Sequence, residues 1–358
     1  MDTKADMSPV NLQYADIKKY YSQVIQKTSD LKTNACCTSK ELPLHIDEVL
    51  LLISDEIKNK YYGCGSPIPL CLTNLKILDL GCGTGRDCYV MSKLAGRNGF
   101  VYGIDMTDKQ IAIAQKYINI QMEAFGYSKP NVKFIFDYIE NIQKHFDRES
   151  LDVVTSNCVI NLTEDKEVIL RQVYEVLKFG GEMFFSDVYA DRRIPEEISR
   201  DPVLRGECLG GALYYKDFVR MARKVGFVDP RVFSWKVINI DNEQIQNLVG
   251  NINFYSVTYR LWKLRSLEDT CEDYGHTAVY DGKIPQSPFK FELDNGHLFN
   301  KNKPERICGN TALMLSQTRL KKYFHVSGTF KQHFGTFQDC KNVRQDNKPD
   351  QSSSNCCR

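Results

Sequence analysis

Apolar residues in the central part of the chain follow two alternating patterns, which predict a sheet with helices between its strands. From Leu75 onward, short apolar runs alternate with longer amphipathic segments, as is typical of βαβ units around a parallel sheet. The predicted strands are 75–80, 100–104, 132–136, 151–155 and 182–186. We therefore expect an α/β fold built on a mostly parallel sheet.

Residues with helical spacing fill the gaps between these strands. Apolar side chains share one face over 111–125 and another over 169–177, and we expect Gly180 and Gly181 to end the second helix. One further helix and two strands are expected downstream: 215–225, closed by Gly226, then 232–238 and 254–261. The last two strands are candidates for an antiparallel edge of the sheet.

The two ends of the chain differ in composition from this centre. The N-terminal segment is mixed, with helices expected over 17–24 and 45–58. Beyond the sheet, Gly, Pro, Asn and Asp interrupt brief apolar runs, so we expect a small, loop-rich C-terminal domain whose clearest ordered stretch is 307–316. The expected divisions are a lid segment over 1–73, the α/β domain over 74–264, the C-terminal domain over 265–338 and a disordered tail over 339–358.

Composition and charge exclude several classes of partner. Lys and Arg number 47 against 45 Asp and Glu, a net charge of +2 without a basic stripe, so we expect no nucleic-acid partner. No apolar run approaches the roughly 18 residues of a membrane span, and the first residues lack the apolar stretch of a signal peptide. We expect a soluble, monomeric, cytosolic protein whose 13 cysteines are mostly reduced thiols.

A glycine-rich turn follows the first predicted strand. Gly81, Gly83 and Gly85 lie between strand and helix, where the absence of β-carbons lets a ligand approach the backbone. A dinucleotide fingerprint needs its third glycine one residue later, at Arg86, which argues against a pyrophosphate ligand. The next strand ends in Asp105, whose carboxylate can accept hydrogen bonds from ribose hydroxyls.

Together these features resemble the class I methyltransferases, in which the same frame binds S-adenosylmethionine. A nucleotide-binding fold for another ligand, or a protein without activity, stays open as an alternative. The resemblance implies a site formed by Asp79, Gly81, Gly83 and Gly85 at the methionine part, Asp105 at the ribose, and Met106, Ile139 and Glu140 at the adenine, together with Tyr62 and Asn157.

Four cysteines lie at positions that suggest chemistry. Cys158 follows the fourth strand and so lies at the carboxyl edge of the sheet, beside the expected transferable methyl. Cys208 lies in the long insertion after the fifth strand, which in this fold can cover the same edge. Cys36 and Cys64 precede the first strand, where N-terminal segments often form a lid. Most other cysteines are interpreted as buried and inert, among them Cys71, Cys82 and Cys88.

From about Leu31 to Leu264 the sequence resembles the arsenite methyltransferase family, because all four cysteines stand in matching motifs. It departs from the family pattern where Cys37 doubles Cys36, and the match weakens beyond Cys271. The motifs are LKTNAC at 31–36, YYGCG at 61–65, GRDCYV at 85–90, GIDMT at 103–107, SNCVINL at 156–162, FSDVY at 185–189 and GECLGGALY at 206–214.

The resemblance implies an enzyme that transfers methyl groups from S-adenosylmethionine to trivalent arsenic, converting arsenite to methylarsenite and dimethylarsenite. Thiolates suit this soft centre, whereas hard carboxylates bind it poorly. The resemblance also implies that Cys158 and Cys208 are permanent arsenic ligands, while Cys64 joins them and then forms a disulfide with Cys36. Thioredoxin or glutathione would reduce this disulfide, and the insertion around 188–213 would complete the arsenic site.

Two other functions stay open at this stage. One is a methyltransferase acting on oxygen, nitrogen or carbon of an organic metabolite, whose activity would survive thiol alkylation. The other is a protein that sequesters arsenic or a soft metal, which would not bind S-adenosylmethionine. A structural zinc site is not expected from the spacing of the histidines and cysteines. Asp187 and Glu207 either support the catalytic edge or are surface carboxylates, and no role is predicted for Cys37, Cys271, Cys356 or Cys357.

Overall fold

The computed structural model describes residues 42–338 apart from residue 62. Its central sheet is built from β1 (Lys76–Leu80), β2 (Phe100–Asp105), β3 (Val132–Phe136), β4 (Leu151–Asn157), β5 (Leu177–Ala190), β6 (Leu213–Tyr214), β7 (Arg231–Ile238) and β8 (Phe254–Trp262). The order is β3-β2-β1-β4-β5-β8-β7, with β6 paired to β5. Strands β1 to β5 run parallel and β8 lies antiparallel between β5 and β7. The predicted parallel sheet with an antiparallel edge is therefore confirmed.

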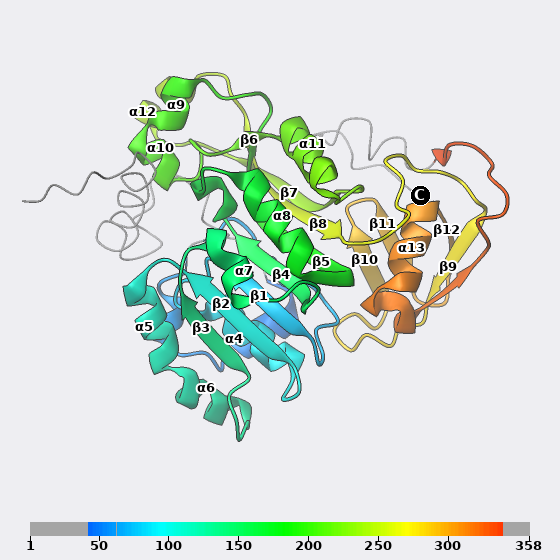
Figure 1. Cartoon of the computed structure of the whole chain (residues 1–358), viewed down its shortest axis with the longest axis horizontal. Helices are drawn as coiled ribbons and strands as arrows, with labels where there is room; N and C mark the ends of the chain where they lie inside the picture. The colour runs from blue at the N-terminus through cyan, green and yellow to red at the C-terminus, as the bar shows by residue number, and fades with distance from the viewer. Residues whose placement is uncertain (1–41, 62, 339–358) are drawn as a thin grey trace, which may run out of the picture.

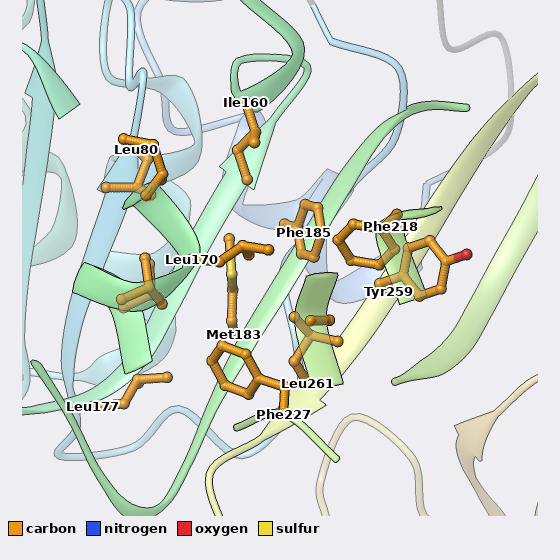
Figure 2. Close-up of a cluster of buried hydrophobic side chains, with 14 of the residues drawn as sticks. Leu80, Ile160, Leu170, Leu177, Met183, Phe185, Phe218, Phe227, Tyr259 and Leu261 are labelled. Atoms are coloured by element: carbon orange, nitrogen blue, oxygen red, sulfur yellow. The ribbon is translucent and has the colours of Figure 1, made fainter. Parts of the chain in front are cut away.

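Helices cover both faces of this sheet (Figure 1). One face carries α7 (Ile142–His145), α8 (Lys166–Val176) and α11 (Tyr215–Val225), and the other carries α2 (Leu44–Leu50), α4 (Arg86–Ala95), α5 (Asp108–Lys116) and α6 (Ile118–Phe125). Neighbouring residues of β1 alternate between these layers, since Ile77 packs in one and Leu78 in the other. Figure 2 shows the first layer, where Phe218 of α11 lies against Phe185 of β5 with ring centroids 5.7 Å apart. None of the described helices is long and apolar enough to span a membrane.

Two expected helices are each divided in the structure. The helix expected over 45–58 is α2 followed by a separate short helix, α3 (Asp55–Lys58). At the break, the side chain of Gln121 donates to Leu52 O and accepts from Ser54 N, both at 3.1 Å, so a distant residue satisfies the backbone. The helix expected over 111–125 is α5 and α6, which meet at Tyr117.

Gly180 and Gly181 do not end a helix, as the sequence suggested. The helix stops at Val176 and β5 already begins at Leu177. Gly180 has φ of +81°, and the register between β4 and β5 shifts at this point, so the glycines form an irregularity at the start of a long strand. Periodicity missed this because a β-bulge and a helix end both favour glycine.

The C-terminal part of the chain is more regular than its composition suggested. It contains β9 (His276–Tyr280), β10 (Lys290–Asp294), β11 (His297–Asn300), β12 (Pro304–Ile307), β13 (Phe324–Ser327) and α13 (Gly309–Gln317). Its strands pair antiparallel as β12-β9-β13 and β10-β11. A buried ion pair joins it to the central sheet, since Arg231 of β7 contacts Asp294 of β10 at 2.8 Å. These strands lie on the side of the sheet formed by β7 and β8, away from α5 and α6 (Figure 1).

Candidate active site

A cavity opens at the carboxyl ends of β1, β2 and β4, the edge at which parallel sheets of this type bind ligands. Most residues predicted for the methyl donor line it: Asp79, Gly81, Gly83, Asp105, Met106, Ile139, Glu140 and Asn157. Gly85 is placed differently, because it precedes α4 as its N-cap and does not line the cavity. Tyr62 lies outside the described residues.

The glycine turn brings backbone to the floor of this cavity. Gly81 and Gly83 have φ of +68° and +54°, in the left-handed region that favours glycine. A β-carbon on Gly81 would lie only 2.2 Å from Cγ2 of Val159, so a larger residue there would displace its neighbour. The turn is fastened to the next strand by a hydrogen bond from Gly83 N to Oδ2 of Asp105, 2.9 Å long. The sequence motif therefore corresponds to a rigid, close-packed turn.

Carboxylates dominate the polar side of the cavity. Burial, and then the nearby Asp87, raises the pKa of Asp79 to about 7, and Asp105 is buried as well. The adjacent cation Arg86 pairs with Asp87 at 2.8 Å, and its guanidinium lies 3.0 Å from the ring centroid of Tyr61. A cationic ligand would offset the remaining negative charge. The carboxylates that line the cavity thus fit S-adenosylmethionine, which carries a sulfonium and an ammonium group.

Cys64, Cys158 and Cys208 converge beside this cavity, although 94 and 50 residues separate neighbouring members of the set. Cys64 and Cys158 form a disulfide with their Cα atoms 5.9 Å apart. The Cys208 thiol donates a hydrogen bond to the carbonyl oxygen of Cys158, 3.4 Å away. All three are buried in one apolar cluster. The sequence analysis expected Cys64 to pair with Cys36, which lies outside the described residues, so that pairing stays a prediction.

Two of these cysteines occupy unusual backbone conformations. Cys158 and Cys208 have φ of +57° and +63°, a region that residues other than glycine rarely adopt. Cys208 directly follows the insertion helices α9 (Glu196–Arg200) and α10 (Pro202–Gly206), and its amide donates to Arg205 O at 3.0 Å. Such outliers persist only where the surroundings hold them, and they concentrate at functional sites. The backbone at both cysteines therefore supports the cluster as a candidate functional site.

Asn157 links the N-terminal cysteine to the sheet, a role that the sequence analysis missed. Its Oδ1 accepts hydrogen bonds from the amides of Cys64 and Gly65, at 3.0 and 3.2 Å. Its Nδ2 donates to Gly65 O at 3.0 Å and to the hydroxyl of Tyr61. The sequence placed Asn157 only at the donor, because nothing local reveals that a segment about ninety residues earlier lies against it. Asn157 therefore positions Cys64 next to Cys158.

Asp187 and Glu207 are buried and are not the surface carboxylates considered from the sequence. Asp187 accepts hydrogen bonds from the amides of Val188 and Asn161, at 2.9 and 3.0 Å. Burial raises the pKa of Asp187 to about 7, and burial lowers the pKa of Lys166 to about 8. Asp187 therefore fastens the loop after Cys158 to β5, while Glu207 directly precedes Cys208.

Comparisons with known proteins point to one enzyme family. Residues 72–226 match the family model described as a methyltransferase domain, and residues 274–357 match that of the arsenite methyltransferase C-terminal domain. An arsenite methyltransferase from Aquipseudomonas alcaligenes is 45% identical over 328 residues, which cover 91% of this chain and 94% of the relative. The arsenite methyltransferase of Homo sapiens is 42% identical over 87% of this chain and 83% of its own length.

A solved structure gives the same result. The crystal structure of an arsenic (III) S-adenosylmethionine methyltransferase from Chlamydomonas reinhardtii matches with a TM-score of 0.80 and 45% identity. The match covers 83% of this chain and all of the solved chain. Fold and sequence therefore point to the same relatives.

Proposed function

The chain belongs to the arsenite methyltransferase family, and we propose that it methylates trivalent arsenic held by the thiolates of Cys64, Cys158 and Cys208. S-adenosylmethionine is the methyl donor, and the proposed products are methylarsenite and dimethylarsenite. The observation that carries the proposal is the convergence of these three cysteines beside a cavity with a carboxylate-rich donor side.

Arsenic binding needs reduced cysteines, so the disulfide between Cys64 and Cys158 must first be opened. Two electrons and two protons from thioredoxin or glutathione convert it to two thiols, and the reductant is oxidised to its own disulfide. Three thiols then displace the three hydroxyl groups of arsenite, with release of three waters. The apolar surroundings of the cluster exclude water from the bound arsenic.

The donor supplies an electrophilic methyl group on its sulfonium. We assign the binding of its methionine part to Asp79 and the glycine turn, that of its ribose to Asp105, and that of its adenine to Met106, Ile139 and Glu140. Tyr62 and Asn157 are assigned to the same site. The chain contributes to methyl transfer by positioning arsenic next to the donor, because Cys158 lines the cavity and also belongs to the cysteine cluster.

A disulfide accounts for a fourth cysteine in the cycle. Arsenic is formally oxidised when it takes the methyl, and two electrons are needed to return it to the trivalent state. We propose that the Cys36 and Cys64 thiolates supply them and become joined by a disulfide, which the external thiol reduces again. Methylarsenite has two exchangeable ligands, so Cys158 and Cys208 suffice to bind it, and the external thiol supplies the two electrons of the second step.

The test is a time course with purified protein, arsenite, S-adenosylmethionine and a thiol reductant, in which mono-, di- and trimethylated products are separated. We expect methylarsenite to appear first and dimethylarsenite later, and alkylation of the thiols to stop both steps. Full activity after alkylation would favour an organic methyl acceptor instead. Binding of arsenic without binding of the donor would favour sequestration.

The remaining expectations are proposals of the same kind. We propose a monomer that acts in the cytosol. We also propose that 1–73 forms a lid over the active site and that 265–338 forms a small C-terminal domain.

A further inference from the structure

A second pair of thiols lies beneath the donor cavity. Cys82 stands in the glycine turn and lines the cavity, whereas Cys88 lies in the first turns of α4 and is fully buried. A β-carbon on Gly103 of β2 would lie 2.7 Å from Sγ of Cys82 and 2.8 Å from Sγ of Cys88. Both sulfur atoms therefore converge on the space that this glycine leaves free. The two thiols interact by a side-chain hydrogen bond and are not joined in a disulfide.

The surroundings keep these thiols protonated but provide a proton acceptor. Burial raises the pKa of Cys82 to about 11 and holds that of Cys88 well above its usual value. Protonated thiols react slowly with oxidants, which agrees with their reduced state. The Cys88 thiol donates to Oδ2 of Asp79 at 3.5 Å, and Asp79, with a pKa near 7, can take up a proton.

We propose that Cys82 and Cys88 form a second site for trivalent arsenicals with two exchangeable ligands, and that its occupation blocks the donor cavity. The choice of ligand rests on the proposed function, since such an enzyme meets these compounds as substrates and products. The reaction joins R–As(OH)₂ and two thiols into R–As(SR′)₂ and releases two waters. Arsenic stays trivalent throughout, so the step needs no oxidant or reductant.

The geometry gives the order of the two bonds. Cys82 is reached first because it faces the cavity, and the second bond to Cys88 is then intramolecular, which favours chelation over binding by one thiol. The third substituent of arsenic stays on the Cys82 side, next to Gly81 and Gly83. It therefore occupies space that the methionine part of the donor requires.

The test uses a chain in which serine replaces Cys36, Cys37, Cys64, Cys158, Cys208, Cys356 and Cys357, so that no adjacent cysteine pair competes for arsenic. S-adenosylhomocysteine binding is measured in it before and after one equivalent of phenylarsonous acid. This background lacks the proposed arsenic ligands and transfers no methyl group, so the result is independent of the proposed function. We expect affinity to fall by about tenfold or more, and excess 1,2-ethanedithiol to restore it. Adding Cys88→Ser, which can keep the hydrogen bond to Asp79, should abolish the loss.

A matched control and a second readout keep the test decisive. Cys308→Ser replaces a buried thiol of a different cluster, so the loss of affinity should persist in that variant. Trypsin cleaves after Arg86, between the two cysteines, so a bridging arsenic should hold two peptides together in mass spectrometry. Unchanged affinity in the background, an equal loss with Cys88→Ser, or an adduct confined to other cysteines would overturn the proposal.

Discussion

The donor side and the acceptor side of the active-site cavity are built in different ways. The donor side comes from successive loops after β1, β2 and β3, and its turn is fixed by a hydrogen bond from Gly83 to Asp105 at the end of the next strand. The acceptor side joins Cys64 from before the sheet, Cys158 from the end of β4 and Cys208 from the insertion. Sequence motifs at strand ends therefore form the proposed donor site, whereas tertiary packing brings together the proposed arsenic ligands. Substitutions on one side should therefore change arsenic methylation, and substitutions on the other side should change donor affinity.

Cys158→Ser should give the largest difference between the effect on methylation and the effect on donor binding. A hard hydroxyl replaces a soft ligand at the residue that lines both the cavity and the cysteine cluster, so methylation of arsenite and of methylarsenite should fall by about 100-fold or more. S-adenosylhomocysteine affinity, measured by calorimetry, should stay within about twofold of the parent. Cys71→Ser, outside this cluster, is the matched control and should keep its activity. Parent rates on both substrates would refute the ligand assignment.

Asp105→Asn should act on the opposite side. We assign the carboxylate of Asp105 to binding the ribose hydroxyls. The amide of asparagine lacks that negative charge, so donor affinity should fall by about 10- to 100-fold. The cysteine cluster does not contain Asp105, so arsenite binding to the reduced protein should be unchanged. Equal donor affinity of variant and parent would remove Asp105 from the donor site.

Most residues that the sequence analysis predicted for the donor side, apart from Gly85 and the undescribed Tyr62, line the cavity, because they lie in short motifs at strand ends. The parallel strand order, the glycine turn and Asp105 follow from periodicity and spacing, and the structure places them around one cavity. The contacts of the acceptor side were beyond reach, since the clamp from Asn157 to Cys64 and the burial of Asp187 depend on segments distant in sequence. The prediction of one continuous helix over 45–58 was wrong for the same reason, because the break is satisfied by Gln121, which is distant in sequence from Leu52.

Asn157→Ala should give a smaller, selective effect. Without the clamp, the Cys64 segment loses its hydrogen bonds to β4, so methylation of arsenite should slow by about tenfold. Methylarsenite should be affected less, because it needs only Cys158 and Cys208. Cys64→Ser should show the same preference between substrates, and Cys36→Ser as well.

A control is needed because Asn157 also lines the donor cavity. S-adenosylhomocysteine affinity of Asn157→Ala should therefore be measured alongside the two methylation rates. Asn157→Asp keeps the acceptor for the amides of Cys64 and Gly65 and should recover part of the loss. Equal slowing of both methylation steps would contradict a role in positioning Cys64.

The smallest effect is expected from pH. Burial raises the pKa of Asp79 from 3.8 to about 7, so the folded chain favours its protonated form and loses stability as pH rises through this range. A cationic donor favours the ionised form, so S-adenosylmethionine affinity should rise by about threefold between pH 6 and pH 8. Asp79→Asn should remove this dependence and raise the melting temperature of the donor-free protein at neutral pH. A pH-independent affinity of the parent would contradict contact between Asp79 and the donor.

The most direct test of the arsenic site is X-ray absorption at the arsenic K-edge on reduced protein with one equivalent of arsenite. Three converging thiolates should give an arsenic centre with three sulfur ligands, and Cys64→Ser should leave two sulfurs and one oxygen. Methylarsenite should show two sulfurs in both proteins. An oxygen-ligated arsenic in the parent, or three sulfurs that persist after Cys64, Cys158 and Cys208 are all replaced by serine, would contradict the account.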